Sequence, residues 1–223
     1  MHNSGFKVYK VTTEHPAQFS KFLKHGLDDC KDSLAKGGII VFPTETLYGL
    51  GVDISNDSAI DKIIDLKGRP GNMPIAIAVS SKKQAKSVAE ISRSAENIID
   101  RCLPKPITFL LPVKPDINPI LTGGSDLIGL RFPDHAVTLA IIKKFGPITA
   151  TSANLHGTEN PITIQPVIAQ FGDNVDIYID SGECKYGLGS TVIDITGNTI
   201  KIIRYGACSG KELEHCIKDI RSS

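Results

Sequence analysis

Two hydroxyl side chains, Thr44 and Thr46, follow directly after an apolar run, in the segment 43–51 with the sequence PTETLYGLG. In an extended backbone successive side chains alternate, so we expect Thr44 and Thr46 on one face and Glu45 and Leu47 on the other. Hydroxyls at the carboxyl end of a strand can bind a small polar ligand, since ligands of open α/β sheets favour that edge. A turn whose hydroxyls bond to the local backbone is the alternative.

Two cations, Lys67 and Arg69, are separated by Gly68 and precede Pro70, in a segment that we expect to form a loop. Lysine offers a point charge and arginine a fork of donors, which together suit a polyphosphate whose charge shifts as a phosphoryl bond breaks. Because isolated charge pairs are common on protein surfaces, a solvated basic turn is the alternative.

Small hydroxyl and amide side chains gather in the segment 149–154, TATSAN, at the end of another apolar run, and Asn160 follows soon after. Ser152 and Asn154 can bond to the phosphate or the sugar of a nucleotide. A serine or asparagine that caps a turn would account for the same residues. Neither a Walker A motif nor GxGxxG occurs in the chain, so a P-loop or dinucleotide-binding fold has no direct support.

Arg131 and Arg204 each stand at the end of an expected strand. Arg131, in the sequence GLRFP, could pair with a carboxylate, and Arg204 offers a further partner for phosphate. The segment 187–192, GLGSTV, enters a strand through glycines that let the backbone approach a ligand. A surface arginine at a strand end, or a simple glycine turn, is the alternative in each case.

His135 and His156 are candidates for acid–base catalysis, and Asp180 or Asp194 could orient a metal ion. No HExxH motif and no nucleophile elbow accompanies them. We therefore expect solvent-facing histidines, and aspartates that serve turns or strand ends.

The composition excludes several classes of protein. The 223 residues carry Lys+Arg 25 against Asp+Glu 24, so a broad basic surface for nucleic acid or an anionic membrane is not indicated. Aromatic residues are 6% of the chain and tryptophan is absent, which argues against base-stacking surfaces. No apolar stretch approaches the roughly 18 residues that span a bilayer, and no secretory leader opens the chain, so we expect a cytoplasmic protein without membrane contact.

The cysteines are odd in number, widely spaced and without a CxxC pair. This pattern indicates neither a disulfide framework nor a zinc cluster. We therefore expect buried free thiols at all of these positions, which are Cys30, Cys102, Cys184, Cys208 and Cys216.

Short β-branched runs alternate with helical patterns along the chain, which is typical of an α/β domain with a parallel or mixed sheet. We expect strands at 6–11, 39–42, 75–79, 107–111, 127–130, 148–151, 175–179, 191–195 and 200–203. We expect helices after Pro16, from Asp57 or Ser58, over 136–145 and after the capping box at 209–212. The first helix would place Phe19, Phe22, Leu23, Cys30 and Leu34 near one face. With no repeat and no Ser/Gly linker, we expect a single domain over residues 1–223.

In chain order, the motifs PTETLYGLG, KGRP, PITFLLP, GLRFPDH, ATSAN and GLGSTVID, with Arg204 after them, resemble the YrdC-like family of L-threonylcarbamoyladenylate synthases. The resemblance spans about residues 37–207, which leaves an N-terminal strand–helix extension and a short C-terminal helix. It implies a twisted, open, mixed α/β sheet with flanking helices around a large concave cavity. It also implies a nucleotidyltransferase, in which L-threonine, bicarbonate or CO2, and ATP give threonylcarbamoyl-AMP and pyrophosphate for threonylcarbamoyladenosine modification of tRNA.

The resemblance also assigns the candidate residues to the two larger substrates. Lys67 and Arg69 match the family's KxR motif, which implies contact with the ATP phosphates and stabilisation of charge as pyrophosphate leaves. Further ATP contacts are implied for Ser152, Asn154, the backbone near Asn160, and Arg204. L-threonine contacts are implied for Thr44, Thr46, Arg131, the backbone at Ala150, and Ser190.

We expect the chemistry to rest on positioning and electrostatics. The amine of threonine would capture CO2 or bicarbonate, and an oxygen of the resulting carbamate would attack the α-phosphorus in line while Mg2+ and the cations hold the leaving group. The family also implies hand-over of the product to a tRNA threonylcarbamoyltransferase, and weak RNA binding. The sequence departs from the family pattern at Lys105, Tyr205, Ala78 and Leu127, which implies an altered shape of the amino-acid pocket.

Three alternatives stay open at this point. A non-catalytic module that binds double-stranded RNA or tRNA could use the same fold, although the near-zero charge weakens this interpretation. A carbamoyl-transfer relative in hydrogenase maturation would join this domain to zinc-finger segments, and the chain has no CxxC pair. A relative that kept the fold and lost the activity is the third.

Overall fold

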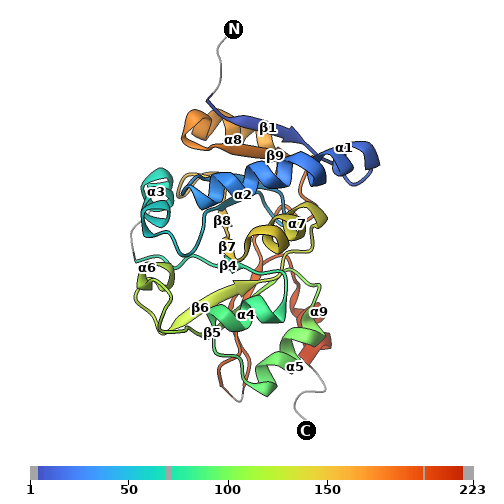
Figure 1. The fold of residues 1–223 in the computed structure, drawn as a ribbon. Helices are drawn as coiled ribbons and strands as arrows, with labels where there is room; N and C mark the ends of the chain where they lie inside the picture. Colours follow the sequence, from blue (N-terminus) through green and yellow to red (C-terminus); the bar gives the residue numbers. More distant parts are fainter. Residues whose placement is uncertain (1–4, 69–71, 198, 218–223) are drawn as a thin grey trace.

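The computed structural model describes residues 5–68, 72–197 and 199–217, whose strands form two mixed sheets (Figure 1). Strands β1, β9 and β2 of the first sheet are parallel, whereas β3 runs antiparallel to both of its neighbours. This 5-stranded sheet lies in the upper half of Figure 1 and has the order β1 (Lys7–Lys10), β9 (Ile177–Asp180), β2 (Ile40–Phe42), β3 (Gly49–Gly51) and β8 (Thr151–Ser152).

The second sheet lies in the lower half of Figure 1 and is also mixed. Its parallel pairs are β10 with β5 and β4 with β6, and its other neighbours are antiparallel. The strand order of this 6-stranded sheet is β11 (Lys201–Arg204), β10 (Thr191–Asp194), β5 (Ile107–Pro112), β6 (Leu127–Arg131), β4 (Ile77–Ala78) and β7 (Ile148–Thr149).

The expected α/β fold with mixed strands and flanking helices is confirmed, with the strands divided between two sheets. The prediction of one strand over 148–151 is wrong, because β7 belongs to the second sheet and β8 to the first. The chain changes sheets at Ala150, whose backbone N–H donates to the carbonyl oxygen of Ala76 at 2.7 Å. An apolar run cannot show this division, since hydropathy does not identify the hydrogen-bonding partner of each residue.

Helices surround the two sheets on their outer faces (Figure 1). Helix α2 packs against α7, and α5 packs against α9. The bounds of the helices are α1 Pro16–Lys21, α2 Leu27–Ala35, α3 Asp57–Lys67, α4 Lys82–Val88, α5 Arg93–Cys102, α6 Pro119–Thr122, α7 Ala136–Phe145, α8 Ile164–Phe171 and α9 Gly210–Ile217, with a π-helical turn at Phe22–Gly26 and a 3-10 turn at Gly172–Asn174.

Local signals account for the ends of two helices. Asn56 caps α3 by accepting a 3.1 Å hydrogen bond from the backbone N–H of Ala59. Gly68 ends α3 at φ 58°, in the left-handed region that favours glycine. At α9 the capping box is confirmed, since the Ser209 N–H donates to Glu212 Oε2 and the Glu212 N–H donates to Ser209 Oγ.

The expected first helix is interrupted by the π-helical turn between α1 and α2. Phe22, Cys30 and Leu34 are buried as predicted, but Leu23 is 41% exposed. The prediction for Leu23 is wrong because the wider π turn changes the angular spacing of side chains along the helix. Phe22 nevertheless reaches the core, where its ring packs edge-on against Tyr9 at a centroid distance of 5.6 Å.

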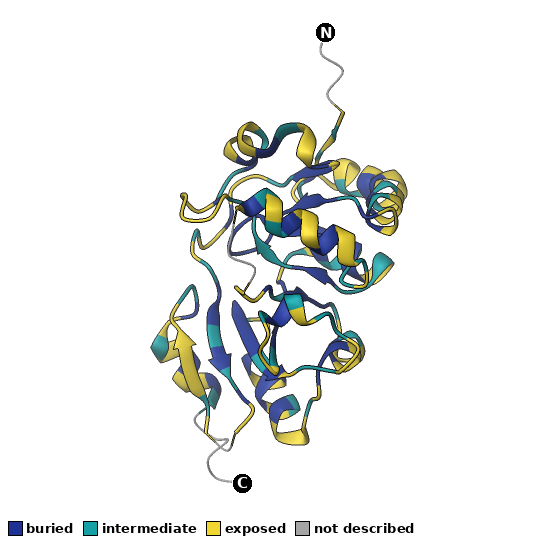
Figure 2. Cartoon of the chain, turned by 90° about the vertical axis from the view of Figure 1, so that its left-hand side faces the viewer, coloured by how far each residue is buried: buried dark blue, intermediate teal, exposed yellow. Residues whose placement is uncertain are grey.

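Buried strands form the centre of each half, and the helices expose their outer faces (Figure 2). One apolar cluster contains residues of both sheets, such as Leu50 of β3 and Phe109 of β5, so the two sheets share a buried core. The cysteines are all buried and free, which confirms that prediction. Burial raises the pKa of the Cys30 and Cys102 thiols to about 12.

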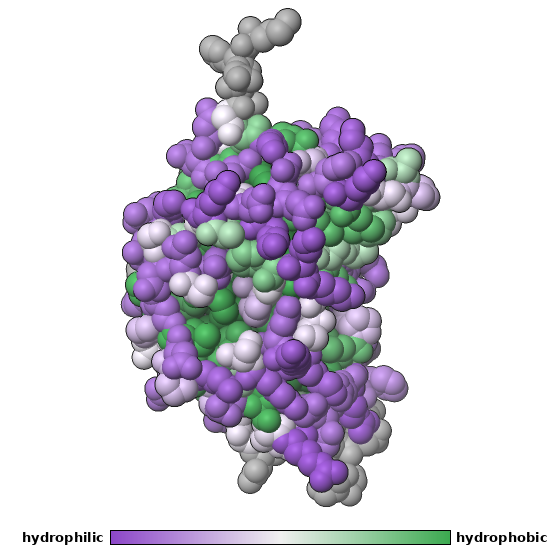
Figure 3. Space-filling view, in the orientation of Figure 1, coloured by the Kyte–Doolittle hydropathy of each residue, from purple (hydrophilic) through white to green (hydrophobic). Residues whose placement is uncertain are grey.

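The surface is mostly hydrophilic in the orientation of Figure 1. Apolar side chains gather on this face between the region of α3 and that of α6, at the level where the two sheets meet (Figure 3). Within the described ranges, every helix is too short or too polar to cross a membrane.

Candidate functional site

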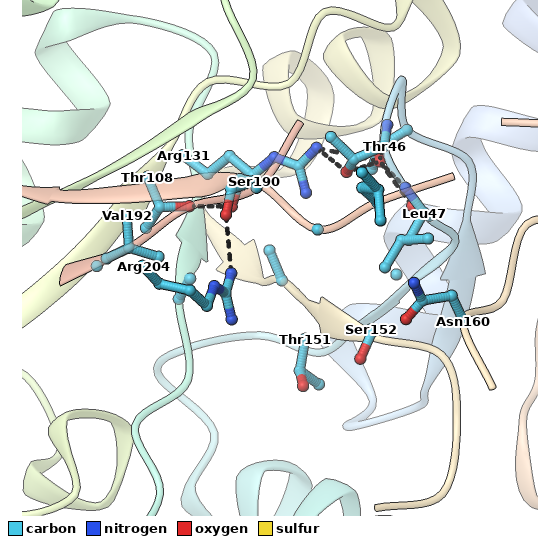
Figure 4. A pocket seen from close by; sticks show the side chains of 18 of the residues that line it. Thr46, Leu47, Thr108, Arg131, Thr151, Ser152, Asn160, Ser190, Val192 and Arg204 are labelled. Atoms are coloured by element: carbon cyan, nitrogen blue, oxygen red, sulfur yellow. Dashed lines mark hydrogen bonds between the residues drawn. The ribbon is translucent and has the colours of Figure 1, made fainter. Parts of the chain in front are cut away.

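A cavity of about 580 Å³ lies between the two sheets, lined by the ends of strands from both (Figure 4). The predicted site residue Arg69 lies outside the described residues. All the other residues predicted for the site line this cavity, and they are Thr44, Thr46, Lys67, Arg131, Ala150, Ser152, Asn154, Asn160, Ser190 and Arg204. The structure therefore brings together residues as far apart in the chain as Thr44 and Arg204.

Thr44 organises the segment after β2 into a turn. Its Oγ1 accepts hydrogen bonds from the backbone N–H groups of Thr46 and Leu47, both at 3.1 Å, and donates to the carbonyl oxygen of Leu47 at 2.6 Å. The Oγ1 atoms of Thr44 and Thr46 lie 3.0 Å apart. The two hydroxyls therefore share a side, as predicted, but through a turn with local backbone bonds and not through an extended strand.

The turn also overturns the expected position of Glu45. In an extended strand its side chain would point away from the threonines, but Glu45 Oε1 lies 2.9 Å from Arg131 Nη2. The same Nη2 donates to Thr44 Oγ1 at 3.2 Å and to Thr46 Oγ1. Glu45 is thus a functional candidate that strict alternation missed. The signal in the sequence is a carboxylate residue between the two threonines of the motif.

Arg131 reaches this cluster from the end of β6. Figure 4 shows its side chain between Ser190 on one side and Thr46 on the other. The Arg131 side chain is 11% exposed and that of Glu45 is 5% exposed, so the ion pair is shielded from water. A shielded guanidinium beside two hydroxyls can bind the carboxylate of a small ligand.

Lys67 is the last residue of α3, so the prediction that it lies in a loop is wrong. Gly68 supplies the left-handed cap, so the helical conformation continues through Lys67. The side chain is buried, and its Nζ donates to the carbonyl oxygen of Asn154 at 2.7 Å and to that of Ser152. Lys67 thus places a positive charge at the cavity wall and holds the segment after β8 in position.

Ser152 and Asn154 are linked directly, since Ser152 Oγ donates to Asn154 Oδ1 at 2.6 Å. The Asn154 amide donates in turn to the carbonyl oxygens of Thr158 and Glu159. Asn160 continues this wall, because its Nδ2 donates to the carbonyl oxygen of Gly187 at 3.1 Å. The segment therefore lines the cavity and also has the turn-capping role that was the alternative to ligand binding, which stays a prediction.

The opposite wall is formed by β5, β10 and β11. Thr108 Oγ1 and Ser190 Oγ lie 2.7 Å apart, and Arg204 Nη2 donates to the carbonyl oxygen of Ser190 at 2.9 Å (Figure 4). Thr108, which sequence analysis did not assign to the site, also lines the cavity. The sequence signal that could have identified Thr108 is a hydroxyl residue within an otherwise apolar strand.

A close backbone approach supports the Ser190 wall. The Gly206 N–H donates to Thr191 Oγ1 at 2.9 Å, and the Ala207 N–H donates to the carbonyl oxygen of Gly189 at 2.8 Å. A Cβ atom at Gly206 would lie 2.2 Å from the Gly189 carbonyl oxygen, a distance that forces a backbone shift. Only glycine fits here, so Gly206 keeps Ser190 next to Arg204.

The side chains of the cavity do not form a magnesium site. Among residues 5–68, 72–197 and 199–217, no group of three or more His, Cys, Asp or Glu side chains could hold a metal ion. The candidate Asp180 accepts from the Gly182 N–H and Asp194 from the Thr196 N–H, so both serve turns. The donor set thus suits an anionic ligand, and we assign no catalytic step to a protein-bound Mg2+.

The sequence departures lie mostly outside the cavity. Tyr205 lines it and is 67% exposed, whereas Lys105, Ala78 and Leu127 are absent from the lining within the described residues. Ala78 is buried beside Arg131 in the register of β4 and β6. Lys105 and Leu127 therefore do not directly produce the predicted change in the shape of the amino-acid pocket. Leu127 begins β6, at the end of the strand opposite Arg131.

Three comparisons with known proteins agree with this geometry. The Sua5/YciO/YrdC family model, described as "Telomere recombination", matches residues 32–206. The chain is 34% identical over 216 residues to a protein of Methanocaldococcus jannaschii named "Putative threonylcarbamoyl-AMP synthase", with 96% of this chain and 98% of that protein covered. It is 36% identical over 190 residues to the threonylcarbamoyl-AMP synthase of Pyrococcus abyssi, with 84% and 56% covered.

Among solved structures, the chain is similar to Pyrococcus abyssi Sua5 in complex with L-threonine. The TM-score is 0.86 at 32% identity, and the match covers 96% of this chain and 62% of that one. The chain thus spans somewhat more than half the length of the Pyrococcus protein but nearly all of the Methanocaldococcus protein. Its similarity to a YciO structure from E. coli, at 22% identity and a TM-score of 0.80, concerns the fold alone.

Proposed function

This chain belongs to the Sua5/YciO/YrdC family, and from this membership we propose that it is a threonylcarbamoyl-AMP synthase. It joins L-threonine, bicarbonate and ATP, and it releases threonylcarbamoyl-AMP, pyrophosphate and water. Relatives with this name at 34% and 36% identity support the proposal. The observation that carries it is the meeting of an arginine–threonine corner and a lysine–serine–asparagine corner in one cavity.

L-threonine occupies the corner formed by Thr44, Thr46 and Arg131. The guanidinium of Arg131 binds the substrate carboxylate, because it is the shielded cation of this corner. The backbone at Ala150 and the Ser190 hydroxyl complete the niche on its other sides, since both line the same cavity. The L-threonine complex of the similar Pyrococcus protein supports this class of ligand.

ATP occupies the part of the cavity bounded by Lys67, Ser152, Asn154, Asn160 and Arg204. Lys67 contributes a fixed positive charge at the end of α3, and Arg204 contributes a second cation from β11. Ser152 and Asn154 offer hydroxyl and amide groups to the phosphates or the ribose. Arg69 adds a third cation to this proposal on its sequence position alone.

The reaction proceeds in two bond-forming steps without a covalent enzyme intermediate. The threonine nitrogen attacks the carbon of CO2, a C–N bond forms, and the nitrogen loses a proton to give a carbamate. A carbamate oxygen then attacks the α-phosphorus, and the bond from that phosphorus to the β-phosphate oxygen breaks as pyrophosphate leaves. The residues of the cavity hold the reacting atoms in line, and the cations stabilise the charge on the leaving group.

The product is a mixed anhydride, so its acyl group is activated for transfer. A tRNA threonylcarbamoyltransferase that accepts it would place the threonylcarbamoyl group on adenosine. Such a hand-over protects the anhydride from water, which would otherwise hydrolyse it.

The decisive experiment incubates the purified chain with ATP, MgCl2, bicarbonate and single amino acids, followed by mass spectrometry of the nucleotides. We expect the mass of threonylcarbamoyl-AMP, together with pyrophosphate, with L-threonine only. Omission of bicarbonate should abolish this mass. Formation of threonyl-AMP without bicarbonate, or no adenylate with any amino acid, would contradict the proposal.

A further inference from the structure

The Glu45 carboxylate lies behind Arg131 and not in the cavity itself. Glu45 is 6% exposed and is absent from the described cavity lining, whereas Arg131 lines it. Oε1 accepts from Arg131 Nη2 at 2.9 Å, and Oε2 accepts from the backbone N–H of Asp134 at 3.0 Å. Each carboxylate oxygen therefore has a charged or backbone donor, and neither is directed to a ligand.

These two bonds connect the turn after β2 to the connection between β6 and α7. A third bond holds the Glu45 backbone, whose carbonyl oxygen accepts from the Tyr186 N–H at 3.0 Å. Glu45 is thus bonded to two segments, the end of β6 with the connection after it and the segment at Tyr186, which meet only in the folded protein. A side chain held in this way can determine where a neighbouring guanidinium lies.

Arg131 depends on that support. Its Nη2 atom is shared among Glu45, Thr44 and Thr46, while its buried Nε has no hydrogen-bond partner within the described residues. Within the described residues, the protein therefore supplies hydrogen-bond acceptors to Nη2 and none to Nε. Without Glu45, a shielded cation would lose its counter-charge and could turn toward water.

We propose that Glu45 is a positioning residue that holds Arg131 in the orientation that binds the amino-acid carboxylate. This inference rests on the proposed function and specifies how its amino-acid site selects an α-carboxylate. Glu45 acts through Arg131, because it does not face the cavity. It also carries a cost, since its charge opposes the substrate carboxylate, and the positioning of Arg131 must outweigh this repulsion.

The test compares wild type, Glu45→Ala, Glu45→Gln, Arg131→Ala and the double variant Glu45→Ala/Arg131→Ala. L-threonine and L-threoninol, which lacks the carboxylate, are each titrated by calorimetry, and the KM for L-threonine and for ATP is measured. Glu183→Ala is the matched control, because Glu183 is an exposed carboxylate that, like Glu45, lies near the Cys184 thiol. Thermal unfolding identifies any variant that fails to fold.

We expect Glu45→Ala to bind L-threonine on the order of tenfold more weakly, the typical effect of losing one charged hydrogen bond. Its preference for L-threonine over L-threoninol should fall toward that of Arg131→Ala, while the KM for ATP changes little. Glu45→Gln should lie between, since an amide accepts from one of the two donors only. The double variant should bind L-threonine no more weakly than Arg131→Ala alone.

Two results would overturn the inference, and they differ from failure of the proposed function. If Glu45→Ala and Glu45→Gln both keep the wild-type preference for L-threonine, or if their effect adds to that of Arg131→Ala, Glu45 does not act through Arg131. If the folded wild type binds no L-threonine and forms no adenylate, the proposed function fails and takes this inference with it.

Discussion

The Nζ atom of Lys67 lies 2.7 Å from the carbonyl oxygen of Asn154, so the C-terminal end of α3 is bonded to the segment that follows β8. The backbone carbonyl oxygen of Lys67 also accepts a hydrogen bond from the His156 N–H at 3.0 Å. The residue therefore connects two cavity walls while its charge faces the proposed phosphate site. Lys67 thus has a structural role, and its electrostatic role toward the phosphates stays a prediction.

Replacing Lys67 by alanine should reduce threonylcarbamoyl-AMP formation by about 100-fold, the typical cost of removing one group that stabilises transition-state charge. Pyrophosphate release at saturating ATP measures this effect. Lys31→Ala, at an exposed position on α2, is the control and should keep wild-type turnover. Near-normal turnover by a folded Lys67→Ala protein would show that the lysine has no part in the reaction.

A second prediction concerns the glycine that supports Ser190. Gly206→Ala should displace Gly189 and Ser190, because the new Cβ would lie 2.2 Å from a backbone oxygen. We expect a loss of stability of about 1–3 kcal/mol, as for overpacking, and a higher KM for L-threonine.

Gly210→Ala is a matched control for this substitution. Its Cβ would meet only the Tyr205 ring at 3.6 Å, an ordinary contact, and Gly210 begins α9. Alanine is the better helix former, so this variant should be as stable as wild type or slightly more stable. Equal denaturation midpoints for the two variants would contradict the close-packing argument at Gly206.

The fold was predictable where a local signal and the tertiary structure agree. The helix over 136–145 has the expected bounds, because its apolar spacing is regular and Gly146 follows it at φ 131°. Helix α5 was missed although Ser92 caps it and Ala95, Ile98 and Ile99 form a buried face. The division of β7 from β8 was beyond sequence reasoning, because it depends on pairing with strands far away in the chain.

The candidate site was predictable as a set of residues but not as a set of contacts. Motif order identified Thr46, Arg131 and Ser190, and the structure places all three at the cavity. The roles assigned to them stay predictions. The sequence offered the turn at Thr44 only as an alternative to an extended strand and could not decide between them. The choice matters because strand alternation and turn geometry predict opposite positions for the Glu45 carboxylate, and the turn brings it to Arg131.

The cysteines give a third prediction. Burial raises the pKa of the Cys184 and Cys208 thiols to about 11 and that of Cys30 and Cys102 to about 12. The thiolate is the reactive form, so these thiols should react slowly with a disulfide reagent at pH 8 in the native protein. Unfolding in denaturant should expose all five cysteines at once.

The control is a variant with an exposed thiol, Lys31→Cys, which should react quickly at one site in the native state. Native labelling of wild type at a comparable rate would show that one of the buried cysteines is accessible. Mass spectrometry of digested protein would identify which one.

His135 gives the fourth prediction, on the pH dependence of stability. The expectation of a solvent-facing histidine is wrong for His135, which is partly buried at the start of α7. Burial lowers the pKa of His135 below its ordinary value of about 6.5, and this outweighs the opposite effects of Glu45 and Asp134. The unfolded chain therefore binds a proton at a higher pH than the folded chain does. As pH falls below about 6.5, the contribution of His135 to stability decreases until the folded histidine is protonated too.

His135→Asn should remove this part of the acid sensitivity. His135 stands at the N-cap of α7 without a side-chain cap bond, and its buried Nδ1 has no partner among the described residues, so asparagine replaces it with a preferred capping side chain. Urea unfolding from pH 5 to pH 8 measures the effect, with His215→Gln on the exposed face of α9 as the control. We expect the loss of stability between pH 7 and pH 5 to be smaller in His135→Asn than in wild type or the control, because the carboxylates titrate alike in all three. Identical losses in the three proteins would show that His135 binds its proton equally well in the folded and unfolded chain.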